Sequence, residues 1–239
     1  MATFVLIHGA CHGGWCWERV VPLLEAKGHR ALAPDLPGMG QDKTPLDTIT
    51  ADLWNGFLVD LINAQAEPVV LVGHSRGGMQ VTAAAEAVPD RIKRLVYLSA
   101  FVPKDGQANM ELAVAHCSQA LMAAGAQMRN HPGPGFPPEA ARSLFYNTTE
   151  EGWTARALSK QCAEPGGPSM VPAHVTPERY GKVRKTYIEC LEDQAITIEG
   201  QRRMQTHANF ESVVSMATDH SPFYCAPEKL AEVLESLAA

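Results

Sequence analysis

The chain has 239 residues, of which 46% are hydrophobic and 19% charged, and its formal net charge is −6. This apolar content excludes a disordered chain, and the acidic balance argues against a nucleic-acid-binding protein, because phosphates would be repelled. No apolar run approaches the roughly 18 residues that a membrane-spanning helix needs, and no secretory signal follows Met1. We therefore expect a soluble, cytoplasmic protein of one domain, without nucleic-acid or membrane partners.

Short β-branched segments alternate with longer segments of helical period, a pattern typical of a parallel sheet with helices on both faces. The six predicted strands are residues 3–7, 30–34, 68–72, 94–98, 186–191 and 210–214. The predicted helices around them are residues 17–27, 52–65, 77–87 and 227–237. The sequence thus indicates an α/β fold built on a six-stranded parallel sheet.

The alternation stops between residues 101 and 176. Short helical pieces are predicted at residues 113–123 and 139–146, between segments rich in proline and glycine. Because a structureless loop of this length is uncommon in a compact domain, we expect residues 101–176 to form a small cap. The core would then consist of residues 1–100 and 177–239.

The strongest motif is Gly73-His-Ser-Arg-Gly77, which follows a buried strand and precedes a helix rich in small residues. This G-x-S-x-G pattern places a serine on a turn so tight that a side chain two positions before or after it would clash. The five-residue pattern alone is weak evidence, but the flanking strand and helix are those that the motif requires. Ser75 is therefore the candidate nucleophile, and helix capping is the alternative role for its hydroxyl.

A serine nucleophile needs a base, which in turn is oriented by a carboxylate. Among the nine histidines, His220 is best placed, because it follows the last predicted strand in a turn-like stretch. The acid should lie between serine and histidine in the chain, at the end of a strand. Glu192 and Asp193 both satisfy this. We choose Asp193, with Asp105 as the second choice.

The same chemistry needs two donors for the oxyanion that forms during acyl transfer. One is expected to be the backbone N–H of Arg76, directly after the nucleophile, and the other that of Ala10, in the glycine-rich loop after the first strand. Gly9 would leave room for the substrate carbonyl. The side chain of Arg76 is expected to be solvated, with pairing to a substrate carboxylate as the alternative.

Neither a metal nor an organic cofactor is predicted. The six cysteines include no C-x-x-C pair, and the glycine-rich loop lacks a phosphate-binding pattern. Apolar cap residues are expected to form the pocket for a small-molecule ester, although packing alone is the alternative role for each. The candidates are Leu121, Met122, Phe136, Leu144, Phe145, Trp153, Met170 and Val171. Of these, Leu121, Phe136 and Trp153 are the predicted substrate-binding residues, together with Gly9.

Several segments of the chain resemble the α/β-hydrolases of the plant methylesterase and hydroxynitrile lyase group. They are residues 4–17 and 22–29, the turn Gly73–Gly77 that carries Ser75 (the elbow), Glu192-Asp193, Asp219-His220 and residues 225–230. The resemblance implies the α/β-hydrolase fold, a triad of Ser75, Asp193 and His220, an oxyanion hole from the amides of Ala10 and Arg76, and a homodimer. Arg76 departs from the family, which has an apolar residue such as leucine at this position.

Two positions separate the reactions of this group. The lyases have a threonine where Gly9 stands and a lysine where Ser221 stands, and these side chains handle the cyanohydrin and the departing cyanide. Lacking both, the chain is predicted to be a serine carboxylesterase. A hydroxynitrile lyase-type C–C lyase and a ligand receptor with vestigial hydrolase activity are the alternatives.

Overall fold

The computed structural model describes residues 1–128 and 133–238. Its strands form a parallel sheet in the order β2-β1-β3-β4-β5-β6. The strands are β1 (Thr3–Ile7), β2 (Arg30–Leu32), β3 (Val69–His74), β4 (Ile92–Leu98), β5 (Lys185–Cys190) and β6 (Ser212–Met216). The predicted six-stranded α/β architecture is therefore confirmed.

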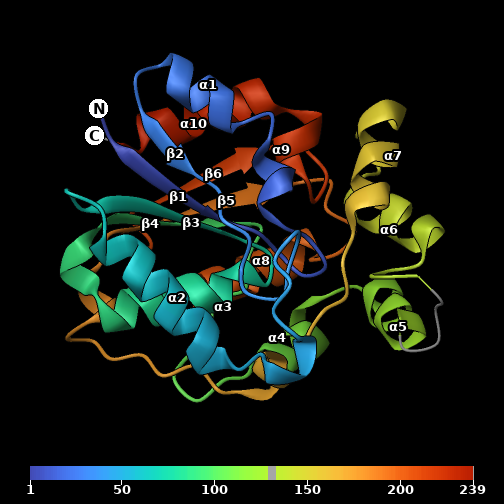
Figure 1. Cartoon of the computed structure of the whole chain (residues 1–239), viewed down its shortest axis with the longest axis horizontal. Coiled ribbons are helices and arrows are strands. Elements are labelled where there is room, and N and C mark those ends of the chain that lie inside the picture. The colour runs from blue at the N-terminus through green and yellow to red at the C-terminus, as the bar shows by residue number, and fades with distance from the viewer. Residues whose placement is uncertain (129–132, 239) are drawn as a thin grey trace.

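Helices cover both faces of the sheet (Figure 1). On one face lie α1 (Val21–Ala26), α9 (Pro222–Cys225) and α10 (Pro227–Ser236), and on the other lie α2 (Ala51–Asn63), α3 (Gly77–Ala87) and α8 (Ile198–Gln205). The alternating side chains of β1 explain this arrangement: Phe4 and Leu6 pack with the first group, whereas Val5 and Ile7 pack with the second. A central strand buried on both faces is apolar throughout.

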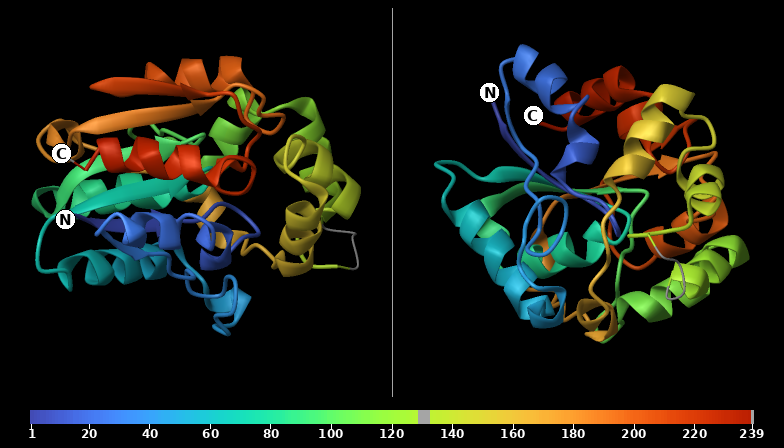
Figure 2. Two further views of the ribbon diagram at one scale, coloured as in Figure 1. Left: turned by 90° about the horizontal axis from the view of Figure 1, so that it is seen from above. Right: turned by 45° about the vertical axis from the view of Figure 1, so that its right-hand side comes forward.

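The remaining helices belong to the segment 101–176 and gather beyond one end of the sheet, away from the N-terminus (Figure 2). They are α4 (Asn109–His116), α5 (Gln119–Met128), α6 (Pro138–Phe145) and α7 (Glu151–Lys160). Helices α7 and α8 were not predicted. The expected helix at residues 17–27 is shorter, because residues 14–17 form a separate 3₁₀ helix.

The order of the strands determines where a ligand can bind. From β1 the chain moves outward to β2, and it then returns to the other side of β1 to form β3. The loops that follow β1 and β3 therefore diverge, which leaves a crevice at the carboxyl ends of these two strands. The elbow and the glycine-rich loop both lie there.

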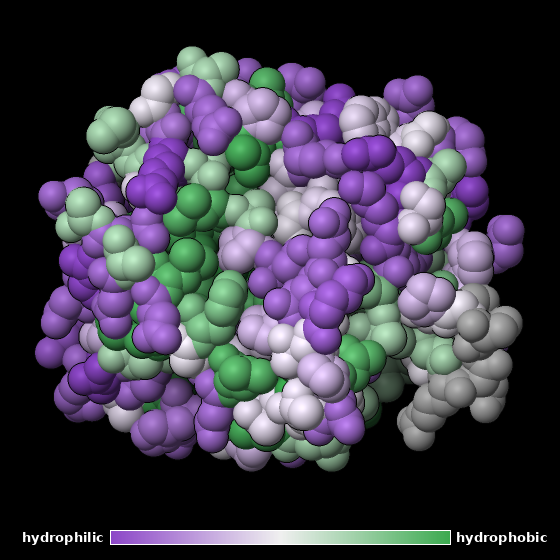
Figure 3. All heavy atoms as spheres, in the orientation of Figure 1, coloured by the Kyte–Doolittle hydropathy of each residue, from purple (hydrophilic) through white to green (hydrophobic). Residues whose placement is uncertain are grey.

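Hydrophilic and hydrophobic side chains are interspersed in patches over the face shown in Figure 3. Within the described ranges, none of the helices combines the length and the apolar character that crossing a membrane requires.

Candidate active site

Ser75 lies on a tight turn between β3 and α3, and its backbone φ of 53° is in the left-handed region. The turn presses the neighbouring glycines against backbone atoms. A Cβ at Gly73 would lie 2.8 Å from the carbonyl oxygen of Gly77, and a Cβ at Gly77 would lie 2.8 Å from that of His8. Because neither position has room for a side chain, the two glycines permit the elbow that carries Ser75.

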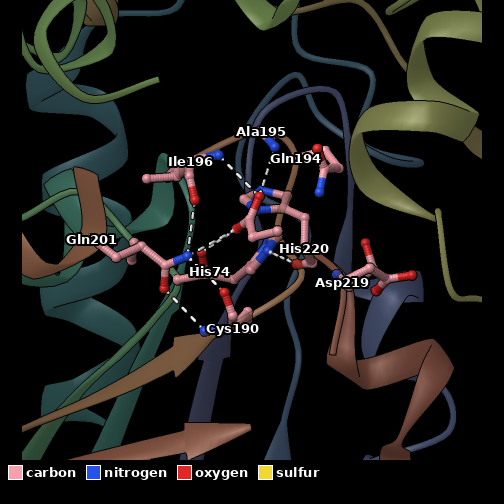
Figure 4. Close-up of polar contacts among 12 residues, drawn as sticks. His74, Cys190, Gln194, Ala195, Ile196, Gln201, Asp219 and His220 are labelled. Atoms are coloured by element: carbon pink, nitrogen blue, oxygen red, sulfur yellow. Dashed lines mark hydrogen bonds and ion pairs between the residues drawn. The ribbon is translucent and has the colours of Figure 1, made fainter. Parts of the chain in front are cut away.

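His220 lies between β6 and α9, and its Nδ1 is 2.6 Å from Oδ2 of Asp193. Asp193 accepts four further hydrogen bonds, from the backbone N–H groups of Ala195 (2.7 Å) and Ile196 (2.9 Å), from the hydroxyl of Ser99 (2.5 Å) and from the side-chain amide of Gln201 (3.5 Å). Figure 4 shows these backbone groups and the imidazole converging on one point. Since the carboxylate accepts at Nδ1, that nitrogen carries the proton and Nε2 is left to accept one.

Ser75 and His220 line the same cavity of about 700 Å³ at the carboxyl end of the sheet. The His220 ring packs against His74, with centroids 4.6 Å apart, and against Phe145 at 5.4 Å. No hydrogen bond joins the Ser75 hydroxyl to His220 within the described residues, and such bonds often tighten only when substrate binds. The structure thus brings the three predicted triad residues to one site.

The other carboxylates considered for the acid lie elsewhere. Glu192 is exposed, and Asp105 is exposed at the surface, where it contacts His174 at 2.9 Å. Asp219 accepts the backbone N–H of Thr148 at 3.0 Å, and Figure 4 shows its side chain turned away from the imidazoles. Among the carboxylates weighed from the sequence, Asp193 alone contacts His220.

The two backbone N–H groups expected for the oxyanion hole are on residues that line the cavity, and neither has an acceptor in the described part of the chain. They belong to Ala10, in the loop after β1, and to Arg76, which directly precedes α3. The second also lies at the positive end of a helix dipole. Donors of this kind stabilise an oxyanion by about 3 kcal/mol each, so the pair is suited to acyl transfer.

Three more histidines surround the candidate nucleophile, and each binds a backbone carbonyl of a neighbouring site residue. The Nδ1–H of His8 donates to Gly9 (2.9 Å), the Nδ1–H of His12 to Ala10 (2.6 Å), and the Nε2–H of His74 to His220 (2.8 Å). The other nitrogen of His8 accepts the backbone N–H of Leu36 at 3.2 Å, which fixes its tautomer. These three rings therefore orient backbone carbonyl groups, and they do not compete with His220 as candidates for the base.

Burial keeps these three rings neutral. Desolvation, assisted by the positive charge of Arg76, lowers the pKa of His8 to about 3, and desolvation lowers the pKa of His12 to about 4. The same cause lowers the pKa of His74 well below its usual value. A neutral ring donates one proton and can accept at its other nitrogen, as the hydrogen bonds of His8 to Leu36 and of His12 to the Tyr146 hydroxyl require.

These lowered pKa values predict acid lability. Below pH 6.5 the unfolded chain binds protons at the three histidines while the folded protein does not, so stability falls as the pH falls. Between pH 6.5 and 5 each ring should remove about 2 kcal/mol from the free energy of unfolding. Urea unfolding at pH 7, 6 and 5 measures this slope. His12→Gln should reduce the slope by about one proton.

The Arg76 side chain is not solvated, contrary to the expectation. It is 3% exposed, its guanidinium lies 4.4 Å over the ring of Trp54, and its Nε is 2.6 Å from Oε1 of Glu164. Because Glu164 already neutralises the guanidinium, the alternative role of binding a substrate carboxylate is not supported.

The cavity wall is mostly apolar and comes largely from the segment 101–176. Of the predicted pocket residues, the structure places these in the wall: Gly9, Leu121, Met122, Phe136, Phe145 and Met170. Leu144 is buried, and Val171 is exposed outside the wall. The wall also contains Met110 and Met128, which had not been singled out. A wall with four flexible methionines can adapt to more than one apolar group.

The structure places Trp153, a predicted substrate-binding residue, outside the cavity wall. Within the described residues it does not reach the cavity. Its ring stacks on Tyr224 with centroids 5.4 Å apart, and the guanidinium of Arg19 lies 4.6 Å over it. Trp153 thus attaches α7 to the core beside α9. The helical period of α7 could not be recognised from its sequence, so the face on which Trp153 lies was unknown.

Gln201 is a supporting residue that sequence reasoning missed. It is fully buried on α8, and its amide nitrogen donates to the carbonyls of Cys190 (3.0 Å) and Ile196 (2.9 Å). Its oxygen accepts the N–H of Cys190 at 3.0 Å. These bonds join the end of β5 to the turn that carries Asp193. No motif marks such a residue, because its role depends on a helix that crosses behind the turn.

In the described ranges, no group of three or more histidine, cysteine, aspartate or glutamate side chains is arranged to hold a metal ion. The fold, the elbow and the residues that meet at it define an α/β hydrolase. The sequence profile of the alpha/beta hydrolase family matches residues 4–233, and the chain belongs to that family.

The chain is similar over nearly its whole length to plant esterases. It is 34% identical to Methylesterase 1 of Arabidopsis thaliana, over 98% of this chain and 95% of that protein. It is 32% identical to Salicylic acid-binding protein 2 of Nicotiana tabacum, over 98% and 96%. The crystal structure of polyneuridine aldehyde esterase matches with a TM-score of 0.88 and 26% identity, covering 100% of both chains. The resemblance to the plant methylesterase group and the class of carboxylic ester hydrolase are thereby confirmed.

Proposed function

We propose that this protein is a serine carboxylesterase that cleaves small, mainly apolar esters through an acyl-enzyme. The observation that carries the proposal is one cavity that holds the Ser75 hydroxyl, the His220 ring and two unpaired backbone N–H groups. Asp193 orients the ring from behind, through the contact at Nδ1. This is the set of groups that acyl transfer to a serine requires.

In the proposed reaction, Ser75 Oγ attacks the ester carbonyl carbon and its proton moves to Nε2 of His220. The carbonyl oxygen becomes an oxyanion, which accepts hydrogen bonds from the N–H groups of Ala10 and Arg76. Collapse breaks the bond to the alcohol oxygen, which takes the proton from His220. Water then attacks the acyl-enzyme by the same route and releases the carboxylic acid.

The cavity wall supports an apolar substrate without a net charge. Its volume of about 700 Å³ accommodates an ester of drug-like size, and its apolar residues and methionines surround the nucleophile. Arg76, which lines the wall, is paired with Glu164. A substrate that carried an anion beside the scissile bond would have to disrupt this pair.

The geometry at Gly9 favours hydrolysis over cyanohydrin cleavage. A Cβ at this position would lie 2.9 Å from Cβ of Ser75 and 3.0 Å from Nδ1 of His74. The threonine of the lyases therefore has no room on this backbone. Ser221, which stands where the lyases have a lysine, is fully buried and offers no charge to a leaving cyanide.

The experiment is covalent labelling combined with a burst measurement. A fluorophosphonate should add one mass label to the peptide that contains Ser75, and p-nitrophenyl butyrate should release a burst of p-nitrophenol equal to the labelled fraction. Prior labelling should abolish hydrolysis. Label on another residue would contradict the mechanism. Cyanide released from a cyanohydrin in place of hydrolysis would favour a lyase, and tight binding of esters without turnover would favour a receptor.

A further inference from the structure

We propose that Arg76 and Glu164 act together as positioning residues for the oxyanion hole. Their buried ion pair holds the loop after β1 so that the Ala10 N–H faces the reacting carbonyl. This inference rests on the proposed esterase function, because an oxyanion hole has meaning only for acyl transfer. The two side chains contact the loop and not the reacting atoms.

Arg76 is tied to the loop through its guanidinium. Nη2 donates to the carbonyl oxygen of Gly9 at 3.1 Å, and Nη1 donates to Oε1 of Gln80 at 2.9 Å, one turn further along α3. The plane of the group stacks on Trp54. A planar guanidinium with contacts on three sides has one orientation, so the position of Nη2 relative to the elbow is set by the core of the protein.

Glu164 is tied to the same loop two residues later. Its Oε2 accepts the backbone N–H of Cys11 at 2.8 Å, while its Oε1 lies against Nε of Arg76. Its side chain is 12% exposed, and burial raises its pKa despite the opposing effect of the Arg76 charge. The ion pair therefore holds the loop on both sides of Ala10, because Arg76 binds the carbonyl of Gly9 and Glu164 binds the amide of Cys11.

The direction of the Ala10 N–H follows from the planarity of the peptide bond. The Gly9 carbonyl and the Ala10 N–H belong to one peptide unit, and in a trans peptide they point in opposite directions. His8 and Arg76 both donate to that carbonyl, so it is held toward them. The N–H of Ala10 is consequently directed to the other side. Rotation of this peptide would remove one of the two oxyanion donors without altering the triad.

The ion pair also explains why an arginine stands at this elbow position. A buried ion pair is poor evidence of added stability, since desolvation offsets much of the attraction. Here the ion pair fixes the oxyanion donor in place before the reaction begins. Such prior placement of hydrogen-bond donors is the main requirement of electrostatic catalysis. In Arg76→Leu the backbone N–H of residue 76 is kept, so this variant tests the side chain alone.

The test compares catalysis with affinity for an oxyanion mimic. In Arg76→Leu, kcat for p-nitrophenyl butyrate should fall by about 10- to 100-fold, while KM changes little. A trifluoromethyl ketone forms a hemiketal oxyanion with Ser75, and its Kd should rise by the same factor as kcat/KM falls. The Kd of the product carboxylate should stay close to its wild-type value. Glu164→Gln should show the same pattern with a smaller loss, because its amide oxygen can still accept from Cys11.

Arg142→Leu is the matched control, since Arg142 forms an exposed ion pair with Glu151 in the same segment as Glu164. Its kcat should equal that of the wild type. Arg76→Lys keeps a positive charge but not the planar fork, and it should lose kcat to an intermediate degree. This variant and Glu164→Gln remain informative if Arg76→Leu fails to fold.

The outcomes separate the two proposals. If folded Arg76→Leu retains the wild-type kcat and the wild-type affinity for the trifluoromethyl ketone, the positioning role is overturned while the esterase function stands. If kcat and thermal stability fall together in every variant while the affinity for the ketone is retained, the pair is structural only, and the positioning role is again overturned. If the wild-type protein itself neither hydrolyses the ester nor binds the ketone, the esterase function fails first.

Discussion

Ser75→Ala is expected to lower kcat for ester hydrolysis by about 10⁴- to 10⁶-fold, because it removes the hydroxyl that forms the acyl-enzyme in the proposed mechanism. The fold should be unchanged. Alanine keeps the Cβ that the elbow already accommodates, and the hydroxyl that is lost faces the cavity and bonds to no group in the described part of the chain. Steady-state kinetics, near-ultraviolet circular dichroism and thermal unfolding measure the two expectations separately.

Ser169→Ala is the matched control for this variant, because Ser169 also lines the cavity but belongs to the segment 101–176. It should retain a kcat close to that of the wild type. Ester should still bind to Ser75→Ala because the cavity wall is intact, with a Kd above the wild-type KM, since slow deacylation lowers KM below the dissociation constant. A folded Ser75→Ala protein that hydrolyses esters at nearly the wild-type rate would contradict the proposed mechanism.

Asp193→Asn is expected to lower kcat by about 10⁴-fold through the wrong tautomer of His220. The backbone N–H groups of Ala195 and Ile196 both donate to Oδ1, so an asparagine must place its oxygen there. Its NH₂ group then faces Nδ1 of His220, where Oδ2 accepts in the wild type. That nitrogen must become the acceptor, which leaves the proton on Nε2, and the ring can no longer take one from Ser75.

The measurement is kcat together with the ¹⁵N chemical shifts of the His220 ring, which report which nitrogen carries the proton. Glu192→Gln changes the adjacent carboxylate, which is exposed, and it should leave both quantities unchanged. If Asp193→Asn retained most of its activity, or if Glu192→Gln lost as much, the assignment of the acid would be wrong.

The sequence predicts well those parts of the molecule in which a local pattern determines the geometry. The strand Thr3–Ile7 and the helix Gly77–Ala87 have the predicted bounds, because the first is an apolar run and the second is a segment of small residues directly after the elbow. The residues for the triad follow from chain order and strand ends, and the structure brings them together. Chain order restricts such residues to one edge of a parallel sheet.

Features that depend on packing between distant segments could not be predicted. Helix α8 has only Ile198 and Met204 as large apolar residues, and its buried contact with the site is the polar Gln201, so no apolar stripe marks the face that meets the site. Arg76 was expected to be in solvent because its partner, Glu164, is 88 residues away in a turn-rich stretch. Nothing in either local sequence indicates that the two side chains meet.

The contact between Glu164 and Cys11 makes the catalytic donors depend on the segment that also shapes the pocket. A bulky ester that fits the cavity only by displacing this segment would withdraw the carboxylate from Arg76 and Cys11, and so would loosen the peptide of Ala10. Such a compound would occupy the enzyme and yet react slowly. Discrimination among esters would then arise in the chemical step, so oversized substrates would behave as inhibitors.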